Sequence, residues 1–310
     1  MEIPPPPANL PSPPFYNVPG IANLRDIGGY SCPAPSSPDP ASATTSNAPS
    51  HSIAKHLIYR SADPSRVTPS GLSRLQELGV RVVFDLRSMP EIMRRGKEWE
   101  GVEKDLKPFR ERSDGGAKDQ ETEEGGIERV WTPVFSEQDY SPEKIALRYK
   151  DYASASEEGF VNAYREILKH GGPAYGAILR HIAAPKPVGC LVHCTAGKDR
   201  TGVLVALLYL LCGVPTETIV KEYALTDLGL ANMKPLFRER LLQNPALAGN
   251  EKGVDNMTSS KEQNMRGTIE MLDREFGGAE EYCRKVLGLT DQELDSIRKN
   301  MVVSKPGTSL

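Results

Sequence analysis

The sequence is poor in cysteine, with five in 310 residues, and the odd number follows no repeating spacing. This argues against a disulfide framework and for a reducing compartment in which a free thiol survives. Residues 1–19 have neither a basic start nor a long apolar stretch, so we expect no signal peptide. The apolar run 203–214 is too short to span a bilayer. We therefore expect a cytoplasmic protein. The nucleus is the alternative location.

An excess of charge of one sign is also lacking, because 38 basic residues stand against 41 acidic ones and the net charge is -3. The chain therefore lacks the excess of positive charge that is typical of proteins that bind nucleic acid or an anionic membrane. We therefore expect no nucleic-acid partner and no stable membrane insertion. The 38% of hydrophobic and 25% of charged residues are typical of an ordinary globular protein.

The length suits one large domain, which we place at residues 20–303. Residues 1–19 are rich in proline and are predicted to be disordered, and residues 304–310 form a short tail. Residues 32–51 are dominated by Pro, Ser, Ala and Thr, which predicts a disordered, low-complexity insertion within a hairpin. Residues 104–126 are highly charged and are expected to form an excursion on the surface.

Strand patterns alternate with helix patterns along the domain. Thr68-Pro69 is typical of a helix start, and Gly79 ends that helix before the apolar strand that begins at Val80. Ser141-Pro142 opens another helix, and Thr290 to Glu293 form a capping box. Further strands are expected at 127–135 and 189–193, and further helices at 160–168, 175–182, 203–212, 216–225, 234–242, 261–276 and 280–287. This alternation predicts an α/β fold with a central, mostly parallel sheet flanked by helices.

The segment between the strand 189–193 and the helix from 203 contains the densest chemical information. Cys194 and Arg200 are separated by five residues and followed by Thr-Gly. A loop that closes onto a helix start directs several backbone N–H groups to one point, and the helix dipole adds to their field. We therefore expect an oxyanion site there. Its phosphate-binding residues would be Thr195, Ala196, Gly197, Lys198, Asp199, Arg200 and Thr201.

The residue types in this loop indicate nucleophilic chemistry on a phosphate ester. A thiol at a helix start beside Arg200 and Lys198 is expected to be ionised at neutral pH, which makes Cys194 a nucleophile. It would attack phosphorus in line and form a phosphocysteine intermediate that water then hydrolyses. Arg200 would stabilise the charge on the equatorial oxygens, and the Thr201 hydroxyl would donate to the leaving sulfur. No metal and no cofactor is required.

Cys194 has two other interpretations, a buried core cysteine and a zinc ligand. A buried core cysteine at a strand end is disfavoured, because it would not explain the glycine, the arginine and the Thr-Gly at the positions that a phosphate loop requires. A zinc site from Cys190, His193 and Cys194 is disfavoured because two cysteines four apart on a strand are too distant for one ion, and no second pair of ligands follows.

Four ordered motifs link the chain to a known family. They are the segments 23–30 (Asn-Leu-Arg-Asp-Ile-Gly-Gly-Tyr), 59–62 (Tyr-Arg-Ser-Ala) and 84–88 (Phe-Asp-Leu-Arg-Ser), together with Ala-Gly-Lys-Asp-Arg in the loop, and the segment 276–282 (Phe-Gly-Gly-Ala-Glu-Glu-Tyr) is similar as well. The sequence resembles the cysteine-dependent tyrosine and dual-specificity phosphatases, and it is most similar to an atypical branch shared by bacteria, fungi and plants. The resemblance covers about residues 20–300 and implies a phosphorylated protein or a phosphoinositide as substrate.

The chain departs from ordinary tyrosine phosphatases in its general acid. These carry Gly before the arginine and an aspartate on a Trp-Pro-Asp loop, whereas this sequence has Asp199 before Arg200 and no Trp-Pro-Asp. A leaving tyrosinate still needs a proton. In the resembling branch the loop aspartate has that role, which here implies Asp199. A brace that pairs with Lys198 or Arg200 is the alternative role for Asp199, and Asp139 is the rival acid.

Other residues are expected to support the site. Asp85 and Arg87 follow the strand from Val80, where we favour bracing over direct chemistry, and His193 precedes the nucleophile. Lys198 is either a solvated lysine that raises the local positive potential or a group that recognises a second phosphate. The second role is the basis of the second hypothesis, an inositol-phosphate or phosphoinositide phosphatase. A non-catalytic phosphate-binding module and a rhodanese-like sulfurtransferase are remoter alternatives, because Cys194, Arg200 and the following Thr-Gly are all present.

Overall fold

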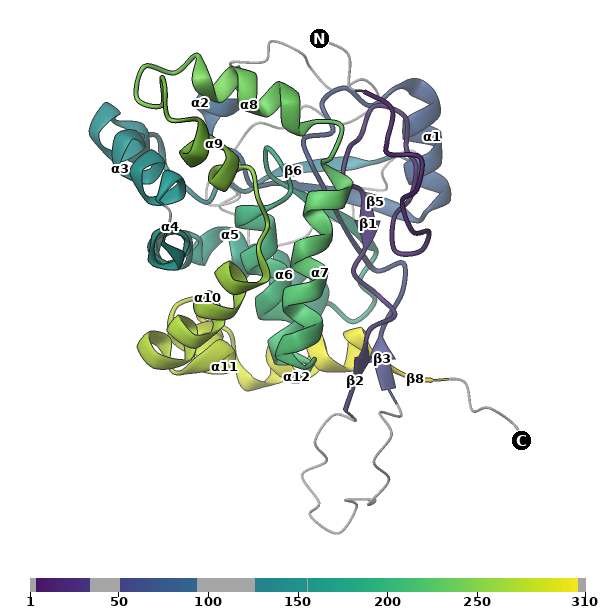
Figure 1. Cartoon of the computed structure of the whole chain (residues 1–310). Coiled ribbons are helices and arrows are strands. Elements are labelled where there is room, and N and C mark those ends of the chain that lie inside the picture. Colours follow the sequence, from purple (N-terminus) through teal and green to yellow (C-terminus); the bar gives the residue numbers. More distant parts are fainter. Residues whose placement is uncertain (1–3, 34–50, 94–125, 155, 306–310) are drawn as a thin grey trace.

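The structure is a computed structural model that describes residues 4–33, 51–93, 126–154 and 156–305 (Figure 1). The insertion that we predicted at 32–51 falls mostly outside the described residues, as does the charged segment 104–126 and most of the tail 304–310. No helix in the described ranges combines the length and the apolar character needed to cross a lipid bilayer.

A five-stranded sheet forms the centre of the molecule, with the order β1-β4-β7-β5-β6. Its strands are β1 (Arg25–Asp26), β4 (Ile58–Ser61), β5 (Val80–Asp85), β6 (Glu128–Trp131) and β7 (Gly189–His193). The strands β4, β7, β5 and β6 are parallel to their neighbours, and only the edge strand β1 is antiparallel. This confirms the α/β class with a mostly parallel sheet.

The register of this sheet positions the site. Ser61 pairs with His193, His193 pairs with Asp85, and Asp85 pairs with Trp131, so four strands end at one level. In parallel sheets the carboxyl ends of the strands share one edge, where ligands bind. The segments that follow these residues therefore meet at the same edge of the sheet.

A second, small sheet extends the edge of the molecule. The strands β2 (Ser31–Cys32), β3 (His51–Ile53) and β8 (Val302–Ser304) are antiparallel. The pairing of β2 with β3 continues the pairing of β1 with β4, which confirms the hairpin that we expected on either side of the insertion.

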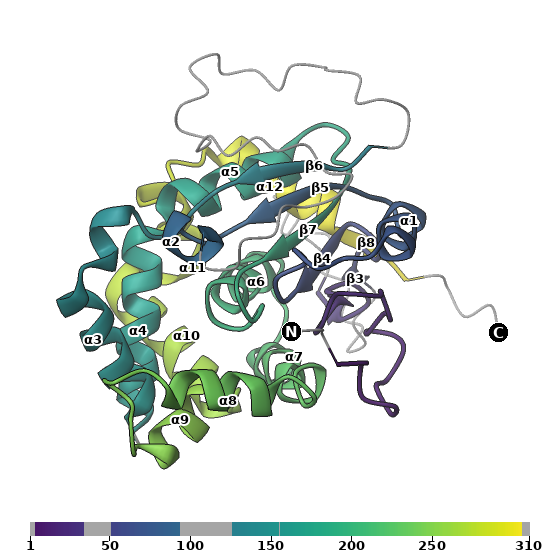
Figure 2. The ribbon, with the colours of Figure 1, turned by 90° about the horizontal axis from the view of Figure 1, so that it is seen from above.

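Helices cover both faces of the central sheet, as Figure 2 shows. One face packs against α1 through Leu75 and against the N-terminal segment through Val18 and Leu24, whereas the other face shares a core cluster with residues of α4 to α7 and of α10 to α12. The helices are α1 (Pro69–Glu77), α2 (Met89–Met93), α3 (Pro142–Ala153), α4 (Glu157–His170), α5 (Gly172–Ala183), α6 (Asp199–Leu211), α7 (Thr216–Gly229), α8 (Lys234–Leu242), α9 (Glu251–Met257), α10 (Glu262–Phe276), α11 (Gly278–Lys285) and α12 (Asp291–Met301), with a 3-10 turn at Glu137–Tyr140.

The helix starts follow the capping residues of the sequence. The Thr68 hydroxyl accepts a hydrogen bond from the Gly71 N–H, and Thr290 with Glu293 forms the predicted capping box. Gly79 ends α1 with a φ of +82, a backbone conformation that glycine adopts without strain. The helix α6, which follows the Cys194 loop, is buried on nearly all sides and anchors the loop in the core.

Two expectations about the fold were wrong. Residues 1–19 were predicted to be disordered, but Phe15 and Val18 are only 2% and 1% exposed. The Tyr16 N–H donates to the Leu24 carbonyl and the Asp26 N–H donates to the Pro14 carbonyl, so the part of this stretch from residue 14 to residue 18 is ordered beside β1. The strand expected at 127–135 is shorter in the structure, where β6 ends at Trp131, although the Thr132 and Val134 N–H groups still donate to the carbonyls of Asp85 and Leu86.

Candidate active site

The Cys194–Arg200 loop begins where β7 ends at His193, and α6 begins at Asp199. Gly197 has a φ of +66, and a Cβ atom there would lie 2.1 Å from the Ser61 carbonyl oxygen. Only glycine is compatible with this close approach. The loop therefore lies directly against the end of β4, at the edge where four strands end.

Every carbonyl oxygen from residue 194 to residue 198 accepts a hydrogen bond from a group outside the loop. The donors are His193 Nδ1 to Cys194 O, the Asp63 N–H to Thr195 O, Asn23 Nδ2 to Ala196 O, Arg60 Nη2 to Gly197 O, and the Gly202 N–H with Arg60 Nη2 to Lys198 O. In a trans peptide unit the N–H points opposite to the carbonyl. Because the carbonyls of the loop point outward to these donors, the N–H group of each following residue points to the inner side of the loop.

The N–H groups of residues 195 to 198 are directed into the hollow of the loop. In the described part of the chain no acceptor takes a hydrogen bond from any of them. Successive N–H groups that converge in this way form an anion-binding nest, and the start of α6 adds the positive end of its dipole. Cys194, only 1% exposed, begins this nest.

A buried ion cluster holds the outer side of the loop. Glu222 of α7 accepts from Arg25 Nε at 2.7 Å and from Arg60 Nη1 at 2.7 Å. Burial and the neighbouring charge of Arg60 lower the pKa of Arg25 to about 10, which marks an excess of positive charge around a single carboxylate. Burial alone would raise the pKa of Glu222, but the two arginines outweigh it and keep the carboxyl ionised.

Replacing Glu222 by glutamine should therefore destabilise the protein strongly, because it leaves two buried guanidinium groups without a counter-charge. We expect a loss of about 3–5 kcal/mol in the free energy of unfolding. Glu217→Gln on the same helix is the matched control, since Glu217 is exposed and its pair with Arg266 lies in solvent. Urea unfolding measures both variants. A loss in Glu222→Gln no larger than in the control would contradict this account.

Arg200 is held by a residue that the sequence analysis missed. Its Nη1 and Nη2 atoms donate to the two carboxylate oxygens of Glu91 at 2.6 and 2.7 Å. The Thr195 hydroxyl donates to the same carboxylate at 2.7 Å. Burial opposes the ionisation of Glu91, but Arg200 outweighs it and lowers the pKa of Glu91. The segment Ser88-Met-Pro-Glu91 matches a capping box, a signal that could have predicted the short helix α2.

Asp199 lies in the first turn of α6 and is partly exposed. Its Oδ1 accepts a hydrogen bond of 2.8 Å from Tyr164, whose hydroxyl also contacts that of Tyr223 at 2.6 Å. Lys198 Nζ is 3.4 Å from the same oxygen. In the described residues no donor contacts Oδ2. One carboxyl oxygen is thus fixed by α4, and the other is open.

Lys198 does not extend into the loop as a second cation. Its ammonium donates to the Met257 carbonyl and, at 3.1 Å, to the Ser259 carbonyl, at the end of α9. It also lies 4.9 Å from the centre of the Phe160 ring. In this structure the Lys198 side chain links the loop to α9, and its contact with a second phosphate stays a prediction.

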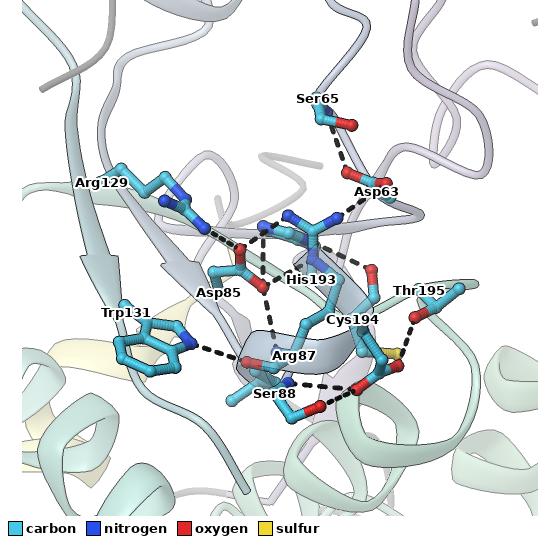
Figure 3. Close-up of polar contacts among 12 residues, drawn as sticks. Asp63, Ser65, Asp85, Arg87, Ser88, Arg129, Trp131, His193, Cys194 and Thr195 are labelled. Carbon is cyan, nitrogen blue, oxygen red and sulfur yellow. Dashed lines mark hydrogen bonds and ion pairs between the residues drawn. The ribbon is translucent and has the colours of Figure 1, made fainter. Parts of the chain in front are cut away.

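Asp85, Arg87 and His193 form a buried brace (Figure 3). Arg87 donates through Nε and Nη2 to Asp85 and through Nη1 to Asp63, whose N–H contacts the loop. Burial favours the neutral acid at Asp85, but the charges of Arg87 and Arg129 outweigh it and lower the pKa of Asp85. None of these side chains lies free to take part in proton transfer, so their placement fits the bracing that we favoured.

His193 helps to set the loop geometry. Burial lowers the pKa of His193 to about 4, so the ring is neutral at pH 7. Because a carbonyl only accepts, its 3.0 Å contact with Cys194 O requires the proton on Nδ1. The ring therefore donates to the carbonyl of the proposed nucleophile.

Two further sequence expectations differ from the structure. The Thr201 hydroxyl, expected to donate to the Cys194 sulfur, has no hydrogen-bond partner among the described residues. Burial would raise the pKa of Asp139, but hydrogen bonds from Lys144 and Ser136 lower it to about 2. Asp139 caps the 3-10 turn, and an ionised cap is a poor proton donor.

No group of three or more His, Cys, Asp or Glu side chains in the described part of the chain is placed to hold a metal ion. The five cysteines are free and buried. The alternative zinc site at Cys190, His193 and Cys194 therefore finds no ligand cluster among these side chains.

Comparisons with known proteins agree with this geometry. A family model described as "Tyrosine phosphatase family" matches residues 16–303. The chain is similar to "Triple specificity protein phosphatase PtpB" of Mycobacterium tuberculosis, with 28% identity over 73% of this chain and 74% of that protein. It is also similar to a "Tyrosine-protein phosphatase" of Nostoc commune, with 27% identity over 79% of this chain and 74% of that protein. The chain belongs to the tyrosine phosphatase family.

Proposed function

We propose that the protein hydrolyses phosphate monoesters, and phosphotyrosine in proteins above all, through a phosphocysteine intermediate on Cys194. The observation that carries this proposal is the nest of N–H groups at residues 195–198. The Cys194 thiol lies at the start of this nest and the Arg200 guanidinium at its end. A tetrahedral dianion is the ligand that such a nest and a guanidinium recognise.

The reaction proceeds in two displacements at phosphorus. In the first, the Cys194 sulfur forms a bond to phosphorus as the ester oxygen leaves, and Asp199 gives its proton to that oxygen. In the second, water attacks the phosphocysteine, Asp199 takes back a proton, and inorganic phosphate leaves with the thiolate restored. Arg200 and the loop N–H groups stabilise the charge on the equatorial oxygens in both steps.

The position of Lys198 favours a phosphoprotein over a phosphoinositide. Its ammonium contacts two carbonyls at the end of α9 and lies 3.4 Å from Asp199, so it offers no independent charge for a second phosphate. One relative bears the name triple specificity protein phosphatase. Activity on phosphoserine and phosphothreonine is therefore the first extension of the proposed substrate range.

The proposal is tested by initial rates of phosphate release from phosphotyrosine, phosphoserine and phosphothreonine peptides, phosphatidylinositol phosphates and p-nitrophenyl phosphate. We expect the highest kcat/KM among the biological substrates for phosphotyrosine peptides, with no effect of EDTA because thiolate and arginine provide the chemistry. A higher kcat/KM for phosphatidylinositol phosphates would show that a phosphoinositide is the preferred substrate. If no phosphate were released from any ester, the proposed function would be refuted.

The same chemistry indicates the compartment. A thiol nucleophile works only where it stays reduced, and the five cysteines are free. We therefore infer the cytoplasm, with the nucleus as the second location.

A further inference from the structure

Three side chains from three helices form a buried hydrogen-bonded chain that ends at Asp199. Tyr164 of α4 donates to Asp199 Oδ1 at 2.8 Å, and its hydroxyl also lies 2.6 Å from that of Tyr223 on α7. The two tyrosines are 0% and 1% exposed. Because buried polar groups need partners, the direction of each hydrogen bond in this chain follows from its donors and acceptors.

Each phenol has a single proton, which fixes the direction of the chain. Burial raises the pKa of Tyr164 and of Tyr223, as does the charge of Asp199, so both hydroxyls stay protonated at neutral pH. Among the described residues, Tyr164 is the only hydrogen-bond partner of the Tyr223 hydroxyl. The Tyr223 proton therefore goes to Tyr164, and the Tyr164 proton goes to Asp199. The reverse order would leave the Tyr223 proton buried without an acceptor.

This direction decides which oxygen of Asp199 carries the proton when the carboxyl is protonated. Oδ1 accepts from Tyr164 and lies 3.4 Å from Lys198 Nζ, so it faces a donor and a cation. A proton on Oδ1 would be repelled by both, whereas Oδ2 is contacted by no donor in the part of the chain that the structure describes. The carboxyl proton therefore lies on Oδ2, the open oxygen.

Packing holds the two tyrosine rings in place. The Tyr164 ring meets the Phe160 ring edge to face, with 5.9 Å between the ring centres. The Tyr223 ring lies against Gly202 of α6, where a Cβ atom would be 3.1 Å from Tyr223 Cδ2. Because the rings cannot shift without disturbing a close-packed core, the Tyr164 hydroxyl is a fixed point that holds the Asp199 carboxyl.

We propose that Tyr164, supported by Tyr223, is a positioning residue that keeps the proton of Asp199 on Oδ2 for transfer to the leaving group of the ester. The inference deepens the proposed phosphatase function and rests on Asp199 as its general acid. In the first displacement the sulfur–phosphorus bond forms, the bond from phosphorus to the ester oxygen breaks, and the Oδ2 proton passes to that oxygen. In the second, a proton of the attacking water passes to Oδ2. Neither phenol gives up its proton, so Tyr164 acts only through Asp199.

Tyr164→Phe tests this role because it removes the hydroxyl and keeps the ring. We expect kcat for phenyl phosphate to fall by about tenfold and kcat for p-nitrophenyl phosphate to fall by less than about twofold, because only the more basic leaving group depends on the Asp199 proton. Tyr223→Phe keeps the contact between Tyr164 and Asp199, so it should show the same dependence on the leaving group with a smaller loss.

A double-mutant cycle with Asp199→Asn is the decisive measurement. Since Tyr164 acts only through the acid, the double variant Tyr164→Phe/Asp199→Asn should hydrolyse phenyl phosphate about as slowly as Asp199→Asn alone. Tyr282→Phe is the matched control, because the buried Tyr282 hydroxyl donates to the Leu168 carbonyl of α4 at 2.6 Å. It should lower the melting temperature but leave the ratio of the two rates unchanged.

Other results would overturn the proposal. Equal slowing of both esters in Tyr164→Phe, unchanged rates in that variant, or losses that multiply in the double variant would make Tyr164 a structural residue of α4. If Asp199→Asn itself showed no dependence on the leaving group, the acid would be another group and the inference would fail with it. A wild type that hydrolysed neither ester would refute the proposed function, so that failure is seen in the wild type and the failure of the inference in the variants.

Discussion

Replacing Cys194 by serine should abolish the hydrolysis of every phosphate ester while the protein still binds them. A serine hydroxyl is not ionised at neutral pH and has no base beside it here, so the first displacement loses its nucleophile. We expect kcat to fall by about 10⁴-fold or more, the scale seen when a nucleophile is removed. The N–H nest and Arg200 do not depend on the sulfur, so the affinity for a phosphotyrosine peptide should stay within a few-fold of the wild-type KM.

The control for this experiment is Cys212→Ser. Cys212 lies at the C-terminal end of α6, the helix that follows the Cys194–Arg200 loop. Cys212 is buried, and burial raises the pKa of Cys212 to about 12, so it remains a thiol at neutral pH. Its replacement should leave kcat close to that of the wild type. Stopped-flow or steady-state assays measure turnover, and fluorescence anisotropy measures peptide binding. Turnover in Cys194→Ser comparable to the wild type would refute the assignment of the nucleophile.

The Cys194–Arg200 loop could be predicted from the sequence because its geometry is local. The strand before it, the glycine within it and the helix after it are neighbours in the chain, and each follows from short-range preferences. The sheet could be predicted for the same reason. Strands that alternate with helices leave few arrangements besides a parallel sheet.

The residues that fix the loop could not be placed in the same way. Arg60 is 137 positions away from the Gly197 carbonyl that it contacts, and Glu91 is 109 positions away from Arg200. Such pairs form only when tertiary packing brings distant segments together, and no periodic pattern records them. Arg25 and Arg60 belong to the motifs 23–30 and 59–62, but only the structure gives their shared partner Glu222.

Lys198 illustrates a different limit, in which the sequence gives the residue type but not the contacts of its side chain. Its place in the loop suggested a ligand for a second phosphate. The structure gives its ammonium carbonyl partners at the end of α9 and aromatic neighbours on α3 and α4. Since a lysine side chain is long and flexible, its position in the sequence does not determine where its charge lies.

The second large effect is expected for Asp199→Asn, and it should depend on the leaving group. If Asp199 protonates the ester oxygen, its loss matters most when that oxygen is strongly basic. We expect kcat for phenyl phosphate and phosphotyrosine to fall by about 10²–10³-fold, but kcat for p-nitrophenyl phosphate to fall by less than about tenfold. The asparagine keeps an oxygen that accepts from Tyr164, so the local structure should persist.

Two further variants separate this role from the alternatives. Asp295→Asn, at an exposed ion pair with Arg298, controls for the loss of a surface charge and should leave both rates unchanged. Asp139→Asn removes the cap of the 3-10 turn and should lower stability without a dependence on the leaving group. Equal slowing of both esters in Asp199→Asn would instead make Asp199 a brace for Lys198, because a brace acts on the loop and not on the departing oxygen.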